Sequence, residues 1–393
     1  MRAVPSTVLL LPLLALAPCA ACTTTLHAPW EGGRLAPYHE GCDNGSAVAC
    51  FNLAVKYDAG EDGLPRDPAK AAALYKKACE AGSMPGCAGV GTMLEKGEGV
   101  PRDDALAALA YRRACAGGDG GGCHNLARLT AAGRGVDRNP GQAAALSQKA
   151  CDLGQALDCE GLGEITAAGR GVPRDLEAAA ALFQKACDLD SAMGCQRLGA
   201  MMAEGQGVPQ DALEAHALFR RALPRLEKAC ADGAAPMCVL SASMIDKGQG
   251  TDADPARALA LFRRACEAGS AGGCAAAGSK LEGGHGAPAD AAQAAALYRK
   301  ACDGGSTPGC SALGALLARG KGVPADAEQA AALQTRACDA GFAPACRRLG
   351  EQVEQGLGAS KDPARAAALY ERACAGGDAA ACERVKRAEP PPG

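Results

Sequence analysis

The fold is decided by a unit that the chain repeats, and a clear copy of it is Cys87–Cys115, CAGVGTMLEKGEGVPRDDALAALAYRRAC. Twenty cysteines form ten pairs with a spacing of eight residues, and successive pairs begin 36 residues apart except for one interval of 37 and one of 43. A fixed period in this range is typical of stacked supersecondary units and overrides a domain count based on length. The pairs are Cys42 with Cys50, Cys79 with Cys87, Cys115 with Cys123, Cys151 with Cys159, Cys187 with Cys195, Cys230 with Cys238, Cys266 with Cys274, Cys302 with Cys310, Cys338 with Cys346 and Cys374 with Cys382.

Each unit has the pattern of two helices joined by a loop. Gly97 and Gly99 follow the first helical stretch, and glycine just past a helix end supplies the left-handed backbone that closes it. Pro101 prevents the helix from continuing, and Asp103 is a residue type that caps the next helix. The second stretch carries an apolar stripe with helical spacing, which in the first unit consists of Ala71, Leu74, Tyr75 and Ala78.

A small residue stands four positions after the second cysteine in all nine first helices. Glycine inside a helix costs about 1 kcal/mol relative to alanine, so we expect these positions to permit close approach of a neighbouring helix. The recurring G-x-G pairs follow helices and lack a βαβ context, which argues against a nucleotide site. The small residues are Ala54, Gly91, Ala127, Gly163, Gly199, Ala242, Gly278, Gly314 and Gly350.

Over residues 39–388 the G-x-G-V-P-x-D loop, the A-x-x-(Y/F) stripe and the x-x-L-G first helix resemble Sel1-like repeats, which are related to tetratricopeptide repeats. The resemblance implies an all-α, right-handed αα-solenoid of nine repeats of about 36 residues. The paired cysteines resemble the disulfide-bridged branch of this family, the Helicobacter cysteine-rich proteins.

That resemblance implies a disulfide within each of the ten pairs. Helices that pack through Ala and Gly can bring the two Cα atoms within the roughly 4.4–6.8 Å that a disulfide needs. Each bond closes a nine-residue loop and is worth roughly 2.5 kcal/mol on a chain-entropy estimate. The alternative is a redox-active thiol pair, which requires an exposed thiol of low pKa, and ten equivalent pairs favour a structural role.

Seven extra residues lie between Cys187 and Cys230, within HALFRRALPRLEKAC. Seven residues are close to two helical turns, so the apolar stripe should stay in phase. Pro224 lies in the extra piece and predicts a kink or a break in the helix. The insertion is either a neutral addition to the outer face or a functional feature, which would be a bend in the stack or a protrusion to which a partner docks.

The N-terminal residues predict export. Val8–Ala17 is apolar but too short to span a bilayer, so residues 1–21 are interpreted as a signal peptide. Cys22 after Ala20 and Ala21 resembles the lipidated cysteine of bacterial lipoproteins. We therefore expect secretion across the inner membrane to the periplasm or the outer membrane, where an oxidising environment allows disulfides. Residues 22–38 are interpreted as a flexible tether, and residues 389–393 as a disordered Pro-rich tail.

Composition excludes several classes of function. The 41 basic and 44 acidic residues leave a net charge of −3, and aromatic residues make up only 3% of the chain. Neither a nucleic-acid binder nor a base-stacking surface is expected from these values. No metal or cofactor is expected: the pair of Cys19 and Cys22 has no second pair to complete a zinc site, and zinc-ligand spacing is absent among His27, His39, His124, His216 and His285.

The first helices carry the candidate ligand-binding residues, because side chains beside the small column differ from unit to unit. In related helical repeats this helix lines the concave side, so these residues should set what binds there. The groove candidates are Phe51, Asn52, His124, Asn125, Arg128, Glu160, Glu164, Gln196, Arg197, Arg347, Arg348 and Glu351, together with the apolar Val239 and Leu240.

A basic residue also stands two positions before each cysteine that ends a second helix. An anion-binding ribbon is one interpretation, but a base in the last turn complements the helix dipole, and we favour that explanation. The residues are Lys77, Arg113, Lys149, Lys185, Lys228, Arg264, Lys300, Arg336 and Arg372.

Two functions follow. The favoured one is a non-catalytic scaffold outside the cytoplasm that binds a protein, a peptide or peptidoglycan along its concave face, with contact to a membrane only through a lipid anchor. The family resemblance alone implies the alternative, a penicillin-binding or weakly β-lactam-hydrolysing protein. The sequence contains no S-x-x-K, K-T-G or G-x-S-x-G motif, and we expect no catalytic residues.

Lipidation of Cys22 leads to a first prediction. Cys22→Ala should release the protein from the membrane fraction, because acyl chains hold a lipoprotein by about 0.8 kcal/mol per buried CH₂ group. Thr23, rather than Asp, follows the cysteine, and in a Gram-negative cell the lipoprotein resemblance then implies the outer membrane. Cell fractionation measures the effect. A variant that sediments with membranes as the parent does would show that the protein is simply secreted or periplasmic.

Overall fold

The computed structural model describes residues 35–170 and 172–388, and it contains twenty helices and no strand within those residues. Each repeat consists of a helix A, which begins near the second cysteine of a pair, and a helix B, which ends at the next cysteine. Helices A are α2 (Ala47–Ala59), α4 (Met84–Lys96), α6 (Gly120–Ala132), α8 (Ala156–Ala168), α10 (Ala192–Glu204), α12 (Ala235–Asp246), α14 (Ala271–Gly283), α16 (Thr307–Arg319), α18 (Ala343–Gln355) and α20 (Ala379–Ala388).

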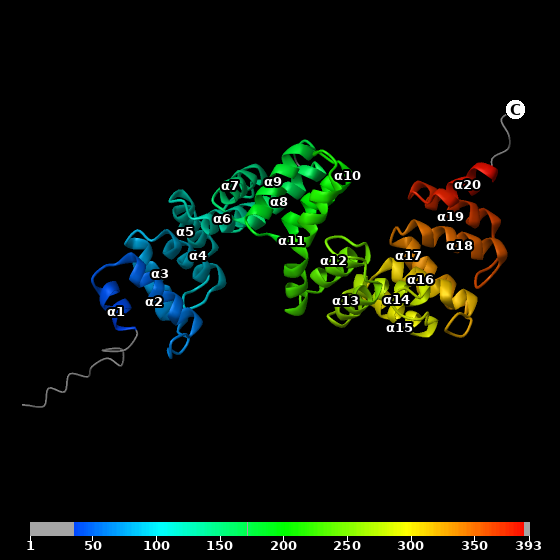
Figure 1. Ribbon diagram of the computed structural model, residues 1–393, viewed down its shortest axis with the longest axis horizontal. Helices are drawn as coiled ribbons and strands as arrows, with labels where there is room; N and C mark the ends of the chain where they lie inside the picture. The colour runs from blue at the N-terminus through cyan, green and yellow to red at the C-terminus, as the bar shows by residue number, and fades with distance from the viewer. Residues whose placement is uncertain (1–34, 171, 389–393) are drawn as a thin grey trace, which may run out of the picture. The chain divides into compact units, whose positions relative to one another are not determined.

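Helices B alternate with them along the chain. They are α3 (Pro68–Glu80), α5 (Asp104–Ala116), α7 (Pro140–Asp152), α9 (Leu176–Asp188), α11 (Ala212–Ala231), α13 (Pro255–Glu267), α15 (Ala291–Asp303), α17 (Ala327–Asp339) and α19 (Pro363–Ala375), and the short α1 (Ala36–Asp43) precedes the first repeat. The helices form two compact units, α1–α6 and α7–α20, divided after Asn139. Within each unit the hairpins stack in chain order (Figure 1), which confirms the predicted helical solenoid of nine repeats.

The loop residues perform the predicted capping roles. Gly97 closes α4 in the left-handed region at φ +72° and donates its N–H to the Met93 carbonyl oxygen. Asp103 caps α5, because its Oδ1 accepts the N–H groups of Ala105 and Leu106, both at 2.9 Å. These contacts satisfy backbone groups that a helix end leaves without partners.

The second loop glycine has a separate reason, which is close contact with the preceding repeat. A Cβ on Gly99 would lie 2.1 Å from the carbonyl oxygen of Pro68, at the start of the preceding helix B. No side chain fits at that distance. The second glycine of the G-x-G pattern is therefore required because the loop lies against the backbone of the preceding repeat.

The small column of helix A has the predicted close contact, and its partner is an aromatic ring of helix B. A Cβ on Gly91 would lie 2.6 Å from the ring of Tyr111, and one on Gly163 would lie 2.7 Å from the ring of Phe183. Seven of the nine helices B provide such a buried ring, whereas α7 has Ser147 and α17 has Gln334 at this position. The rings are Tyr75, Tyr111, Phe183, Phe219, Phe262, Tyr298 and Tyr370.

All ten predicted disulfides are present. Each joins the last turn of one helix B, or of α1, to the following helix A, with Cα atoms 4.4 to 4.8 Å apart, which is the short end of the range for a disulfide. Close packing through small side chains therefore places every pair within bonding distance. The confirmed bonds join Cys42 to Cys50, Cys79 to Cys87, Cys115 to Cys123, Cys151 to Cys159, Cys187 to Cys195, Cys230 to Cys238, Cys266 to Cys274, Cys302 to Cys310, Cys338 to Cys346 and Cys374 to Cys382.

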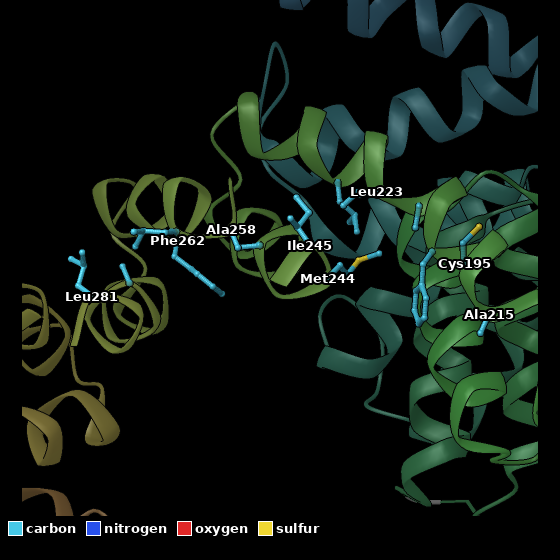
Figure 2. Close-up of a cluster of buried hydrophobic side chains, with 14 of the residues drawn as sticks. Cys195, Ala215, Leu223, Met244, Ile245, Ala258, Phe262 and Leu281 are labelled. Atoms are coloured by element: carbon cyan, nitrogen blue, oxygen red, sulfur yellow. The ribbon is translucent and has the colours of Figure 1, made fainter. Parts of the chain in front are cut away.

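The core of the second unit is a continuous row of side chains rather than a single centre. One buried cluster runs from α9 to α17. Figure 2 shows part of it, where Leu223 of α11, Ile245 of α12, Phe262 of α13 and Leu281 of α14 follow one another from repeat to repeat. Each repeat therefore buries its apolar stripe against its neighbours.

Of the predicted kink or break at Pro224, the break does not occur. Helix α11 is continuous over 20 residues with Pro224 inside it. Leu218, Leu223 and Leu226 are buried on both sides of the proline, and this burial holds the helix together although one backbone donor is missing. The apolar stripe stays in phase across the insertion, as predicted, because the ring of Phe219 packs against Gly199 in the same way that Phe183 packs against Gly163.

The ends of the chain lie largely outside the described residues. Residues 1–34, which include the expected signal peptide and Cys22, are among them, as is the expected tail 389–393. Helix α1 begins at Ala36, so residues 36–38 of the expected tether are helical. Within the described part of the chain, no helix combines the length and apolar character required to cross a membrane.

Two glycines of α8 provide a test of the packing. Gly163→Ala should destabilise the fold by about 1–3 kcal/mol, because its methyl group would overlap the Phe183 ring. Gly161→Ala should instead stabilise it by up to about 1 kcal/mol, because no atom of the described residues crowds the added Cβ within 4 Å and alanine favours the helix. Thermal unfolding of the oxidised variants measures both effects. A shift of the same sign in both would contradict the packing described here.

Candidate ligand-binding groove

Helices A line the inner side of the stack in each unit. Direct contacts join α2 to α4 and α4 to α6 in the first unit, and α8 to α10, α12 to α14 and α14 to α16 in the second. Among the described residues, no pair of successive helices B makes contacts of similar extent. The solvent-facing side chains of helices A therefore share one surface on this side of the stack, which we call the helix A face.

All fourteen predicted groove residues lie on helices A, at one, two or five positions after the second cysteine. Several have structural roles. The ring of Phe51 packs against Tyr75 with centroids 5.9 Å apart, and Val239 and Leu240 pack against the buried core of the second unit. The charged candidates form local clusters.

In the first unit the cluster centres on Glu95, which sequence reasoning did not select. Arg128 and Arg134 form ion pairs with its carboxylate, and Tyr111 donates its hydroxyl to Glu95 Oε2 at 3.1 Å. Burial alone would raise the pKa of Glu95, but hydrogen bonds and charges from these partners outweigh burial and lower it. Arg134 also pairs with Asp104 at 2.9 Å. The charges of this cluster are thus matched within the protein.

A first pocket of the second unit lies between α8 and α10 and has a volume of about 430 Å³. Phe183 of α9 forms part of its lining, as do Arg197 and Glu164, which form an ion pair at 2.9 Å. Next to this pair, Glu160 is hydrogen-bonded to Ser191, and burial raises the pKa of Glu160. The charges that line this pocket also include Arg170 and Glu204.

A second pocket, of about 280 Å³, occupies the equivalent place between α16 and α18. Gln334 of α17 replaces the aromatic ring, and it is only 1% exposed. The predicted residues Arg347, Arg348 and Glu351 line this pocket together with Arg319 and Gln352, which were not predicted. The signal for the altered lining was available in the sequence, because AALQTRAC breaks the A-x-x-(Y/F) stripe at Gln334.

The basic row of helices B connects neighbouring repeats. Lys185 Nζ lies 2.6 Å from Asp152, at the end of the preceding helix B, and Arg372 lies 3.0 Å from Asp339. Arg336 donates to the carbonyl oxygen of Cys302 at 3.1 Å. These contacts favour the helix-dipole explanation and extend it, because the base stabilises the C-terminal end of the neighbouring helix.

Among the described residues, no serine, lysine or free thiol lines either pocket. Within residues 35–170 and 172–388, no group of three or more His, Cys, Asp or Glu side chains is placed to hold a metal ion. What both pockets offer is a shallow surface with arginines, carboxylates, amides and small apolar side chains, which suits binding by hydrogen bonds and charge.

Comparison with known proteins identifies the repeat. The Sel1 repeat family model matches nine segments that together cover more than half of the chain. They are residues 47–83, 85–119, 121–155, 159–191, 192–223, 237–270, 273–306, 307–342 and 343–378.

A solved structure shares the architecture. The chain is similar to c5321, a protective antigen of uropathogenic Escherichia coli with an SLR fold, at 26% identity and a TM-score of 0.51, over 89% of this chain and 81% of that one. It is also similar to Helicobacter pylori cysteine rich protein B, at 31% identity and a TM-score of 0.27, over 32% of this chain and 89% of that one. The latter belongs to the cysteine-rich group that the sequence resembles.

A curated relative matches a shorter segment. Cytochrome c oxidase assembly factor 7A of Xenopus laevis is 39% identical over 61 residues, which are 16% of this chain. The match spans about a quarter of that relative's length, or 26%.

The Glu95 cluster leads to a prediction about acid stability. A carboxylate whose pKa is lowered in the folded state stabilises the fold above its unfolded-state value of 4.5, and this contribution is lost as the pH falls through the folded-state pKa. Glu95→Gln should therefore lower the melting temperature at pH 7, and the difference from the parent should shrink below about pH 4.5. Melting curves across pH measure this, with the more exposed Glu98→Gln as a control that should change little. A difference that is independent of pH would contradict the role given to the Glu95 charge.

Proposed function

Since this chain belongs to the Sel1 repeat family, we propose that it is a non-catalytic scaffold outside the cytoplasm that binds an extended segment of a partner protein along its helix A face. The observation that carries the proposal is the repetition of a pocket at equivalent positions, between α8 and α10 and again between α16 and α18. Pockets repeated along a stack of hairpins suit a ligand that is itself extended.

The different linings of the two pockets support a peptide ligand. The helix backbones are equivalent, but the first pocket has the ring of Phe183 and the second has the amide of Gln334. A polypeptide offers a different side chain to each site along one continuous backbone. A small molecule would occupy only one of them.

The location outside the cytoplasm is supported by the ten disulfides, because bonds of this kind form and persist in oxidising compartments. The signal peptide over residues 1–21 and the lipid on Cys22 belong to the same proposal. Together they would place the helix A face in the periplasm or on the membrane surface.

The β-lactam alternative lacks a supporting observation in the two pockets. Acyl transfer to an enzyme needs a nucleophile and an adjacent base, and the described lining residues include no serine, cysteine or lysine. We therefore retain the scaffold as the proposed function.

Filling the pockets tests the proposal. Ala200→Trp and Ala315→Trp would each place an indole in one pocket, since both alanines are lining residues. The oxidised protein should bind a subset of an array of overlapping peptides from envelope and secreted proteins, and each variant should lose part of that subset because its pocket is blocked. Array binding of parent and variants is the measurement.

Ala332→Trp is the matched control. Ala332 is exposed on helix B α17, away from the pocket lining, so this variant should keep the binding pattern of the parent. An array without bound peptides, or binding that both pocket variants retain in full, would refute the scaffold proposal.

A further inference from the structure

The arginine two positions after the second cysteine has a carboxylate partner in two repeats. Arg197 of α10 pairs with Glu164 at 2.9 Å, and Arg384 of α20 pairs with Glu354 at 2.7 Å. In both cases the acid lies on the preceding helix A. The Arg384 guanidinium also lies over the ring of Tyr370, 5.0 Å from its centroid.

Arg348 of α18 occupies the same repeat position but differs in its surroundings. Glu164 and Glu354 stand five and eight positions after the second cysteine of their repeats. Ala315 and Ala318 stand at the same two positions of α16, and both alanines line the second pocket. In the part of the chain that the structure describes, no carboxylate forms an ion pair with Arg348. The pocket therefore occupies the place where other repeats hold the acid.

The hydrogen-bond partner of Arg348 is neutral, and two further arginines lie close to it. Its Nη1 donates to Ser311 Oγ at 2.6 Å, and Ser311 is itself held by Gln334, with Ser311 Oγ 2.7 Å from Gln334 Oε1. Burial lowers the pKa of Arg348, and the charges of Arg347 and Arg319 lower it further. Because like charges repel, the half-buried guanidinium of Arg348 beside two other arginines is stabilised when an anion lies close to it.

The nearby acids are already engaged. Glu351 and Asp378 both pair with Arg347, at 2.8 and 3.2 Å. Arg319 is exposed at the end of α16, where the helix dipole favours a base, and it forms no ion pair among the described residues. Within the same residues, two of the three arginines around this pocket thus have no carboxylate.

Gln352 provides an independent sign of a ligand. It is 9% exposed and lines the pocket, and its buried Oε1 has no hydrogen-bond partner among the residues that the structure describes. A buried acceptor without a partner costs free energy that a bound donor would recover. A peptide offers both a carboxylate for the arginines and N–H donors for this amide.

We propose that the pocket between α16 and α18 binds an acidic side chain, Asp or Glu, of the peptide ligand, whose carboxylate takes the place left by Ala315 and Ala318. The inference rests on the proposed function and specifies the chemistry of its ligand. Arg348 and Arg319 neutralise the acid, since charge-assisted hydrogen bonds to guanidinium groups are the strongest such contacts available here. The ion pair of Arg197 with Glu164 is the intramolecular version of the same contact.

The test uses a fluorescein-labelled peptide of alternating Glu and Gly, with the corresponding Gln–Gly peptide for comparison. Fluorescence anisotropy with the oxidised full-length protein should show binding of the Glu peptide that is about tenfold tighter or more, the size of one charge-assisted contact. Arg348→Gln should remove most of that preference. Arg372→Gln, which removes the same charge from helix B α19 outside the lining of both pockets, should leave it unchanged.

Ala315→Glu separates binding from folding. It supplies Arg348 with the acid that Glu164 supplies to Arg197, so it should melt at or above the temperature of the parent and lose the preference for the Glu peptide. Ala315→Gln has a similar size without the charge and should neither raise the melting temperature as much nor abolish the preference as fully. If Arg348→Gln fails to fold, this pair still decides the question.

The outcomes separate the two proposals. Equal binding of both peptides, or an Ala315→Glu variant that binds the Glu peptide as the parent does, would overturn the acidic-ligand inference. If the Trp variants still lose binding to part of the peptide array in that case, the scaffold proposal stands. If no peptide binds in either experiment, both proposals are wrong.

Discussion

The close contact between a small residue of helix A and a ring of the following helix B sets the spacing on which the rest of the structure depends. Gly91 against Tyr111 and Gly163 against Phe183 leave no room for a Cβ. Because the helices approach so closely, the loop glycines lie against the preceding helix and the paired cysteines lie within bonding distance. Small side chains bury little area each, and the covalent bridges add stability to a core that is poor in large residues.

The features that sequence could predict are those that recur at one offset from the cysteines. Caps such as Asp103, the small column and the disulfides belong to this class, because a period makes each visible several times. Continuity through Pro224 was not predictable from a local rule, since it depends on burial of Leu223 and Leu226 against neighbouring helices. The same holds for the basic row, whose contacts reach the preceding repeat.

The candidate site is harder to predict because it is defined by departures from the period. Arg348 was visible as a groove residue, but its significance depends on Ala315 and Ala318 one repeat earlier. Gln334 was visible as a break in the stripe, yet its contact with Ser311 required the structure. A repeated backbone thus separates two tasks: the shared positions build the stack, and the exceptions give each pocket its chemistry.

The short span of every disulfide affects how the protein is made and how its family varies. Each bond joins residues eight apart, so the two cysteines of a pair lie close together along the chain before the fold forms. Oxidation can then join each cysteine to its correct partner locally, without first bringing distant parts of the chain together. For the same reason a whole repeat can be gained or lost in evolution without leaving an unpaired thiol in the stack, because no bridge among the described residues crosses more than one junction between hairpins.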